Sequence, residues 1–233
     1  MNLSLLELLR CPYCGNRLSL VDNISLKRVS STVDSGVLGC ECCAFPVVSG
    51  IPTLIANDRT REAVRALEAG HHETALFIML DLADETRSAA FRRLLADDSK
   101  PTYRDALDIL SRDAEGTYFI YRFSDPTYLT AETLLRTVTQ HQTKPKHWLD
   151  LCGGSGHLTR VFTDINPDRK TDCFNVLVDV TFWKLWLAAR FTAQGCTPVC
   201  CDANHPLPIV DDIFQMILLS DAFPYIWHKR LLA

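Results

Sequence analysis

The pattern of apolar and polar positions divides the 233-residue chain into three regions. Residues 1–56 end in "FPVVSGIPTLI", an apolar stretch broken by Pro and Gly, which is typical of short strands and turns. Residues 57–146 repeat apolar positions at helical spacing. From residue 147 onward, short apolar runs alternate with helical periods. We therefore expect a small β-rich domain, a helical region and an α/β domain over residues 147–233.

The helical region contains four segments with helical spacing, with breaks at Pro101 and Gly116. The segments are "REAVRALEA", "ETALFIMLDLADE", "RSAAFRRLLADD" and "YRDALDILSRD". A further helix, "TAETLLRTVTQHQ", is expected to begin at Thr130, whose hydroxyl can cap a helix N-terminus. The short "GTYFIYRF" fits either a strand or a buried turn, and the pattern does not decide between them.

Four apolar runs in the last region predict strands. They are "HWLDLC", "FNVLVDV", "TPVCCDA" and "DIFQMILLSDAF", and the stretches "GHLTRVFTD" and "TFWKLWLAARFTAQG" fit intervening helices. Nearly continuous apolar strands that alternate with helices indicate a parallel sheet covered on both faces. Trp183 and Trp186 lie three residues apart on the second helix, where we expect core anchors rather than ligand contacts.

Composition and charge exclude only a few classes of protein. The chain has 24 Lys and Arg against 28 Asp and Glu, so no overall basic field attracts nucleic acid. The start, "MNLSLLELLRCPYC", has no basic segment or cleavage site of a signal peptide, and Asp81 interrupts the longest central apolar run. We expect a cytoplasmic protein without membrane contact, whose ten cysteines are metal ligands or reduced thiols.

Two Cys-x-x-Cys pairs lie in the first region. Cys11 and Cys14 form one pair, and Cys40 and Cys43 form the other. Two such pairs supply the four thiolates of a tetrahedral structural Zn²⁺ site. Cys42 is an alternative fourth ligand, but Cys-x-Cys spacing is less usual, so we expect Cys43. Buried thiols without metal are disfavoured, because so short a region cannot otherwise bury a sufficient core.

The first region resembles a zinc-ribbon family. The resemblance rests on "LLELLRCPYCGNRLSL" and "LGCECCAFPVVSGIPTLI". The second segment contains "GIP" at residues 50–52, after the turn at residues 45–47, which is the family's typical ending. Stand-alone members of this family activate tRNA, rRNA and release-factor methyltransferases, and others are fused ahead of bacterial methyltransferase domains. The chain departs from the family in having only Ala44 between the last Cys and the aromatic-Pro pair. The resemblance implies a zinc ribbon that docks on or stabilises a methyltransferase.

A glycine-rich loop follows the first strand of the last region, in "WLDLCGGSGHLTR". A dinucleotide fingerprint would need a glycine where Thr159 stands. The loop instead resembles motif I of the class I S-adenosylmethionine-dependent methyltransferases, in which an acidic residue precedes a Gly-x-Gly-x-Gly-like turn. The order of Cys152 and Gly153 departs from that motif. His157, beside the loop, is either a surface cap or a participant.

Acidic residues also close the next two strands. Asp179 stands about 25 residues beyond the loop, where the resemblance places the carboxylate that accepts both ribose hydroxyls. Asp202 and Ala203 match the positions that read the adenine edge, and Phe182 is a candidate cover for the adenine. The resemblance thus implies a cofactor site made of Asp150, Cys152, Gly153, Gly154, Gly156, Asp179, Val180, Phe182, Asp202, Ala203 and Ser220.

The fourth strand carries the candidate proton-handling groups, Asp221 and Tyr225, in "SDAFPY". This differs from the [Asn/Asp]-Pro-Pro-[Tyr/Phe] turn of enzymes that methylate adenine or glutamine nitrogen. "LPIVDDIFQMILLSDAF" resembles small-molecule methyltransferases of the quinone-biosynthesis type. We expect a methyltransferase with a small-molecule acceptor, in which residues 57–146 form a lid or acceptor wall. The alternatives are a non-catalytic adaptor that binds a partner, and an RNA or protein methyltransferase of the translation apparatus.

The last region accounts for four of the seven strands that a class I domain orders as 3-2-1-4-5-7-6. After the fourth strand only "PYIWHKRLLA" remains, which would leave that strand as an exposed sheet edge. We expect a piece of a longer protein, rather than a degenerate domain or one whose sheet a partner completes. The expected fold class is therefore α/β: a zinc ribbon, a helical region and a partial Rossmann-like parallel sheet.

Overall fold

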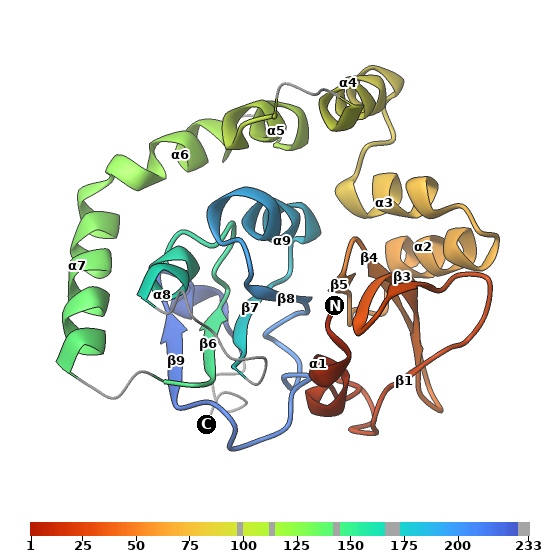
Figure 1. The fold of residues 1–233 in the computed structure, drawn as a ribbon, viewed down its shortest axis with the longest axis horizontal. Helices are drawn as coiled ribbons and strands as arrows, with labels where there is room; N and C mark the ends of the chain where they lie inside the picture. The colour runs from red at the N-terminus through yellow and green to blue at the C-terminus, as the bar shows by residue number, and fades with distance from the viewer. Residues whose placement is uncertain (97–99, 112–114, 142–144, 166–172, 228–233) are drawn as a thin grey trace.

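The computed structural model describes residues 1–96, 100–111, 115–141, 145–165 and 173–227. These residues form an antiparallel sheet near the N-terminus, a row of helices and a parallel sheet (Figure 1). The α/β class expected from the sequence is confirmed at this level. In this described part of the chain, no helix has both the length and the apolar character needed to cross a membrane.

The antiparallel sheet belongs to the first region. After helix α1 (Leu3–Leu8), the strands are β1 (Ser19–Leu20), β2 (Lys27–Val29), β3 (Thr32–Gly39), β4 (Ala44–Val48) and β5 (Ile51–Pro52). The order is β1-β3-β4-β5, and β2 pairs with the other part of β3. The turn between β4 and β5 uses Gly50 at a φ of +75°, where a Cβ would lie only 2.7 Å from the Met1 nitrogen. Pro and Gly therefore shape this sheet as the pattern indicates.

Six helices of the described chain form the middle region. They are α2 (Asp58–Glu68), α3 (His72–Leu80), α4 (Glu85–Ala96), α5 (Tyr103–Leu110), α6 (Glu115–Tyr121) and α7 (Pro126–His141). Helices α2 and α3 lie beside the antiparallel sheet, and the row from α4 to α7 arches over the parallel sheet (Figure 1). The expected helical segments are confirmed except for the end of "ETALFIMLDLADE", because α3 ends at Leu80 and the left-handed Asp81 (φ 59°) follows it. Residues 97–98 and 112–113 of two other segments lie outside the described residues. The undecided "GTYFIYRF" is neither strand nor simple turn, because it forms most of α6 and a 3-10 turn at Arg122–Ser124.

The start of α7 corrects the expected cap at Thr130. The side chain of Asp125 accepts the backbone N–H groups of Thr127 and Tyr128 at 2.8 and 3.3 Å, as an N-cap does. Thr130 already lies one turn inside the helix, where its hydroxyl donates to the Pro126 carbonyl at 2.8 Å. Proline is tolerated at the first helical position, so the helix begins four residues earlier than expected.

The last region forms a four-stranded parallel sheet with the order β8-β7-β6-β9. Its elements are β6 (Trp148–Leu151), α8 (Thr159–Ile165), β7 (Asn175–Asp179), α9 (Phe182–Leu187) with a π-helical turn (Ala188–Thr192), β8 (Thr197–Cys200), β9 (Met216–Leu219) and a 3-10 turn (Phe223–Tyr225). The chain winds outward through β7 and β8 and then returns to the other side of β6. All four carboxyl ends meet at one edge, and the crevice beside β6, where the strand order reverses toward β9, is where such sheets bind ligands.

The antiparallel sheet is docked on the β8 edge of the parallel sheet. The Leu54 N–H donates to the Cys200 carbonyl at 2.7 Å, and Thr53 pairs with Cys200 in a parallel bridge. A second connection is antiparallel, between Leu9 and Ile209. Residues from both sheets share one buried cluster, which includes Leu5, Leu9, Phe45, Leu149, Val176 and Val199. The first region is therefore part of the main core and not a detached module.

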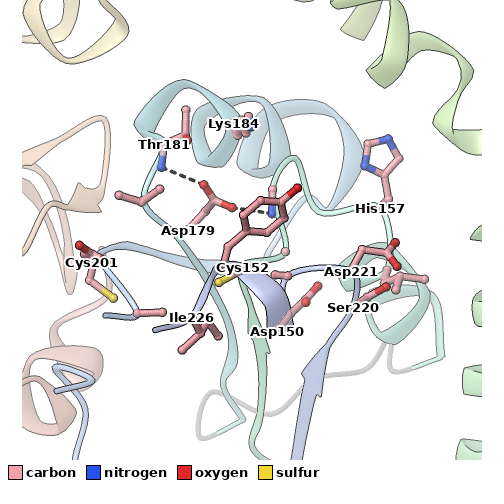
Figure 2. Close-up of a pocket in the computed structure, with 18 of the residues that line it drawn as sticks. Asp150, Cys152, His157, Asp179, Thr181, Lys184, Cys201, Ser220, Asp221 and Ile226 are labelled. Atoms are coloured by element: carbon pink, nitrogen blue, oxygen red, sulfur yellow. Dashed lines mark hydrogen bonds between the residues drawn. The ribbon is translucent and has the colours of Figure 1, made fainter. Parts of the chain in front are cut away.

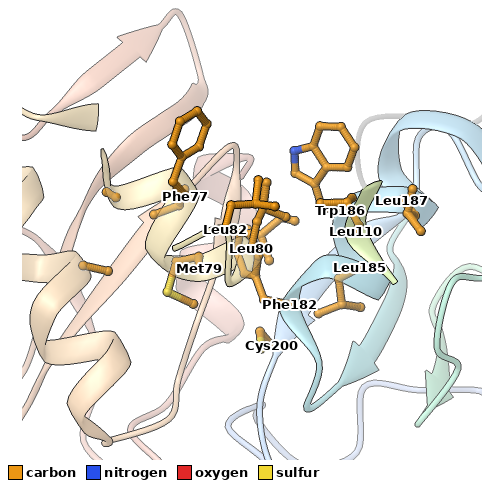
Figure 3. Packing of buried hydrophobic residues seen from close by; sticks show 14 of the residues in the cluster. Phe77, Met79, Leu80, Leu82, Leu110, Phe182, Leu185, Trp186, Leu187 and Cys200 are labelled. Atoms are coloured by element: carbon orange, nitrogen blue, oxygen red, sulfur yellow. The ribbon is translucent and has the colours of Figure 1, made fainter. Parts of the chain in front are cut away.

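Helices cover both faces of the parallel sheet. On one face, Phe77 and Leu80 of the α3 segment pack toward Phe182 and Trp186 of α9 (Figure 3). Trp186 is only 1% exposed, so its expected role as a core anchor agrees with its position. On the other face, side chains of α7 and α8 form a further cluster, including Tyr128, Leu135, Val161 and Phe162. These contacts hold the middle region against the sheet.

Candidate functional site

Four cysteine sulfurs converge at the tip of the antiparallel sheet. The Sγ atoms of Cys11, Cys14, Cys40 and Cys42 all lie within 4.8 Å of one another. Three of the separations are 3.6 Å (Cys11 to Cys42), 3.8 Å (Cys14 to Cys40) and 3.6 Å (Cys40 to Cys42). Tetrahedral Zn²⁺ with bonds of about 2.3 Å sets its sulfur ligands about 3.8 Å apart. The cluster therefore fits a zinc ion closely.

Cys42 takes the place that the sequence analysis gave to Cys43. The Cys40 N–H donates to the Cys43 carbonyl at 3.0 Å, which folds residues 40–43 into a tight turn. This turn aims Cys42 at the other three sulfurs, while the half-buried Cys43 packs against the apolar core. Spacing statistics along the chain could not reveal this, because the short link through Ala44 changes the turn. The expected Cys43 is thus replaced by Cys42 in the candidate zinc site.

A pocket of about 400 Å³ opens at the carboxyl ends of the parallel strands (Figure 2). It gathers residues from the ends of all four strands, and most of the residues singled out from the sequence line it. Those residues are Asp150, Cys152, Gly153, Gly154, Asp179, Val180, Asp202, Ala203, Ser220, Asp221 and Tyr225. The acidic residues that follow successive strands along the chain therefore also lie together in space.

The glycine loop, residues 152–156, adopts a backbone that glycine favours. Cys152, Gly154 and Gly156 have φ angles of 59°, 57° and 76°. A Cβ at Gly153 would lie 2.5 Å from Leu177 and 2.6 Å from the Asp150 carboxyl, so no side chain fits there. Relative to motif I, Cys152 and Gly153 are in the reverse order. A cysteine therefore occupies a left-handed position of the loop, which costs about 1–2 kcal/mol.

Asp150 and Asp179 lie at the base of the loop and differ in their surroundings. Asp150 is 1% exposed and accepts the Thr159 hydroxyl at 2.6 Å. Burial, with a smaller contribution from the charge of Asp179, raises the pKa of Asp150 to about 7 against the opposing effect of the bond from Thr159. Asp179 accepts the backbone N–H of Gly154 at 3.0 Å and that of Thr181 at 2.8 Å (Figure 2). Asp179 is therefore the carboxylate that organises the loop.

The third acidic position, Asp202, shapes the turn after β8. Its side chain accepts the Asn204 N–H at 2.9 Å, and its carbonyl accepts the His205 N–H at 3.0 Å. This turn presents Ala203 and Asn204 to the pocket. Behind it, the first region holds residues 208–210, because the Arg10 N–H donates to the Pro208 carbonyl at 2.9 Å.

The middle region supplies one wall of the pocket, and the sequence alone does not indicate which of its residues form this wall. Tyr118, Phe119 and Arg122 of α6 and its following turn line the pocket, and so does Lys184 of α9. The Arg122 guanidinium donates to the Asp221 carboxylate at 2.7 Å across 99 residues of chain. No local motif marks these residues, because a helix distant in sequence brings them to the sheet.

Two expected cofactor residues do not line this pocket. Gly156 faces Ala188 and Ala193, where a Cβ would lie 3.0 and 3.1 Å from their methyl carbons, so its role is close packing. Phe182 is 5% exposed and belongs to the apolar cluster on the other side of α9, which leaves it unable to cover a ligand in the pocket. His157, in contrast, does line the pocket, and because it is only 5% exposed it is not a surface cap.

Comparison of the chain with known proteins adds no identity to this site. None of the protein-family models matches the sequence, and none of the curated proteins matches it either.

Proposed function

We propose that the chain binds S-adenosylmethionine in the pocket at the carboxyl ends of β6–β9 and directs its methyl group to an acceptor. The observation that carries the proposal is the convergence of a glycine loop and three strand-end aspartates on one pocket of a parallel sheet. Counted along the chain, the strand order is third, second, first, fourth, which agrees with the first four strands of the class I methyltransferase order.

The charges of the pocket suit this cofactor better than a dinucleotide. Asp150, Asp179 and Asp202 would oppose a pyrophosphate, whereas S-adenosylmethionine carries an ammonium, a sulfonium and a ribose diol. Each oxygen of the Asp179 carboxylate accepts one backbone N–H and keeps a free lone pair for a ribose hydroxyl. Asp202 and Ala203 are then the candidates to bind the adenine, as the resemblance implies.

The acceptor side of the pocket is formed by α6 and the end of β9. The cofactor supplies an activated methyl group, so the chain must orient the acceptor and take up its proton. Asp221 is the candidate base, held by Arg122 at 2.7 Å, and Tyr225 lies on the same side. Tyr118 and Phe119 add aromatic surface. A pocket of about 400 Å³ and a net charge of -4 favour a small-molecule acceptor over RNA.

The candidate zinc site has a structural role in this proposal. Four thiolates complete a tetrahedral zinc, which leaves no open position for a substrate. The metal would fix residues 8–10, which directly precede Cys11. These residues pair with residues 208–210, just beyond the Asp202 turn. The zinc ribbon is then a built-in stabiliser of the cofactor pocket.

A non-catalytic adaptor is the second candidate function, and one observation favours it. Ile217 of β9 is 56% exposed, and the nearby Phe223 and Trp227 are 54% and 80% exposed. Apolar side chains beside a sheet edge are typical of surfaces that contact another protein. An adaptor of this kind would not need a working cofactor site.

Calorimetric titration with S-adenosylhomocysteine separates the two functions. We expect one micromolar site in the wild type and in Asp211→Ala, an exposed control, and weaker binding in Asp202→Ala. Binding should be followed by a screen of small-molecule acceptors and of RNA with labelled S-adenosylmethionine. Absence of binding to a folded, zinc-loaded chain would favour the adaptor.

A further inference from the structure

A chain of side-chain contacts joins helix α5 to the middle of the glycine loop. The Tyr103 hydroxyl lies 3.0 Å from Ser155 Oγ, and Ser155 Oγ lies 3.2 Å from His157 Nδ1. Ser155 is fully buried and His157 is 5% exposed, so water does not compete for these bonds. Tyr103 belongs to the middle region, 52 residues before Ser155. The contact therefore connects two regions that are far apart in sequence.

The three groups are neutral near pH 7. Burial raises the pKa of Tyr103 to about 12, against the opposing effect of its bond to Ser155, so the phenol keeps its proton. Burial, followed by the positive charge of Arg122, lowers the pKa of His157 to about 4, so the imidazole is uncharged. In this state the Tyr103 hydroxyl can donate to Ser155, and the Ser155 hydroxyl can donate to Nδ1 of His157.

The loop around Ser155 is held mainly through its backbone, and the side chain of Ser155 adds a contact from the middle region. Ser155 stands between Gly154 and Gly156, both in the left-handed region, and glycine backbones sample many conformations. The Gly153 N–H donates to the Val178 carbonyl at 3.1 Å, the Gly156 N–H to the Gly153 carbonyl at 3.0 Å, and the Gly154 N–H to Asp179. In addition, the Thr192 hydroxyl donates to the Ser155 carbonyl, and the Tyr128 hydroxyl donates to the His157 carbonyl at 3.2 Å. The side chain of Ser155 is thus the link between the loop and helix α5.

We propose that Tyr103 is a positioning residue for the glycine loop, acting through Ser155 and His157 to hold the Gly154 amide against Asp179. This inference rests on the proposed function, because the loop and Asp179 are where the cofactor would bind. It gives the middle region a role in cofactor affinity in addition to its place as a wall of the pocket. Without the hydroxyl, the loop would spend part of its time away from the conformation that meets the cofactor.

The test combines Tyr103→Phe and Ser155→Ala with Tyr121→Phe as the matched control. Tyr121 is also in the middle region, but it is 64% exposed and does not line the pocket. Amide hydrogen exchange of the zinc-loaded chain measures the loop without any ligand, and titration with S-adenosylhomocysteine measures its consequence. Tyr103→Phe removes one hydrogen bond and Ser155→Ala removes two. We therefore expect exchange at Gly154 and Gly156 to accelerate about fivefold in Tyr103→Phe and more than that in Ser155→Ala, each with a similar loss of affinity.

Three outcomes decide the inference. Faster exchange confined to the loop, with β6 and β7 amides and the Tyr121→Phe variant unchanged, supports it. Combining the two substitutions should then add nothing to the effect of Ser155→Ala, because that variant already lacks the partner of the Tyr103 hydroxyl. Loop exchange equal to that of the wild type overturns it, and so does an acceleration spread evenly over the sheet, which indicates general destabilisation. If the wild type binds no S-adenosylhomocysteine, the proposed function is refuted. The exchange experiment still tests the positioning role of Tyr103, because it is carried out without ligand.

Discussion

The carboxylate of Asp179, at the end of β7, accepts the backbone N–H of Gly154 at 3.0 Å, although 25 residues separate them. Its other oxygen accepts the Thr181 N–H at 2.8 Å, so one side chain joins the glycine loop to the start of α9. The site that would recognise a ribose is therefore also the site that shapes the loop. Loss of this carboxylate should affect both properties.

Asp179→Ala should lower the affinity for S-adenosylhomocysteine by about tenfold or more, because hydrogen bonds to a charged group contribute about 1.5–3 kcal/mol. Calorimetric titration of the variant beside wild type measures the change. Asp211→Ala, an exposed aspartate outside the pocket, serves as the control and should bind as the wild type does. Equal affinity in Asp179→Ala and wild type would show that the ligand binds elsewhere.

Cys42→Ser should abolish stoichiometric zinc, whereas Cys43→Ser should keep it. The physical reason is that the Cys42 sulfur completes the group whose members lie within 4.8 Å of one another. Elemental analysis of the two purified variants gives the zinc content directly, and their thermal stability gives a second reading, because a structural zinc stabilises the folded chain. The reverse pattern, with metal lost only in Cys43→Ser, would restore the ligand set expected from spacing.

Cys152→Gly should stabilise the chain by about 0.5 kcal/mol. Glycine removes the strain of a left-handed residue, but it loses more backbone entropy on folding, which offsets part of the gain. The matched variant is Gly154→Ala, which places a Cβ at a φ of 57° with only Phe119 within 4 Å. It should destabilise by about 1 kcal/mol. Urea unfolding compares the two, and shifts of the same sign would mean that the loop differs from this structure.

Asp150 should make stability depend on pH. Its pKa is raised to about 7 in the folded chain, so the folded state binds a proton that the unfolded state releases near its ordinary value of about 4. The stabilisation is present at low pH and is lost as pH rises through about 7. The free energy of unfolding of Asp150→Asn, relative to that of the wild type, should therefore rise by about 2 kcal/mol between about pH 5 and pH 8.

Unfolding measured in denaturant at several pH values tests this difference. Both chains carry the same cysteine cluster, so metal release at low pH cancels in the comparison. Asp211→Asn is the control, because that side chain is exposed and should show no such trend. A constant difference between wild type and Asp150→Asn over the whole pH range would contradict the assigned burial.

Several elements could be predicted because their signals are local. Apolar runs that end in Asp150, Asp179 and Asp202 indicated the parallel strands and the edge at which the pocket lies. Short aromatic segments carry less information: the pattern around Phe119 leaves open a strand or a buried turn, whereas the segment is helical, since packing against the sheet decides it. The cap at Thr130 failed for a related reason, because Asp125 offers a stronger cap at a start that Pro126 also favours.

The remaining parts of the site depend on contacts between distant segments. Arg122 meets Asp221, and Tyr103 meets Ser155, only after the middle region has packed against the sheet. The choice of Cys42 over Cys43 depends on a turn of a few residues whose direction spacing does not encode. Predicting such contacts requires the three-dimensional structure.

The most direct test of the proposed cofactor site is a crystal structure of the zinc-loaded chain grown with S-adenosylhomocysteine. We expect ligand density in the pocket at the carboxyl ends of β6–β9, with the ribose on Asp179 and the adenine beside Asp202 and Ala203. An empty pocket at saturating ligand, or density at another place on the chain, would contradict it.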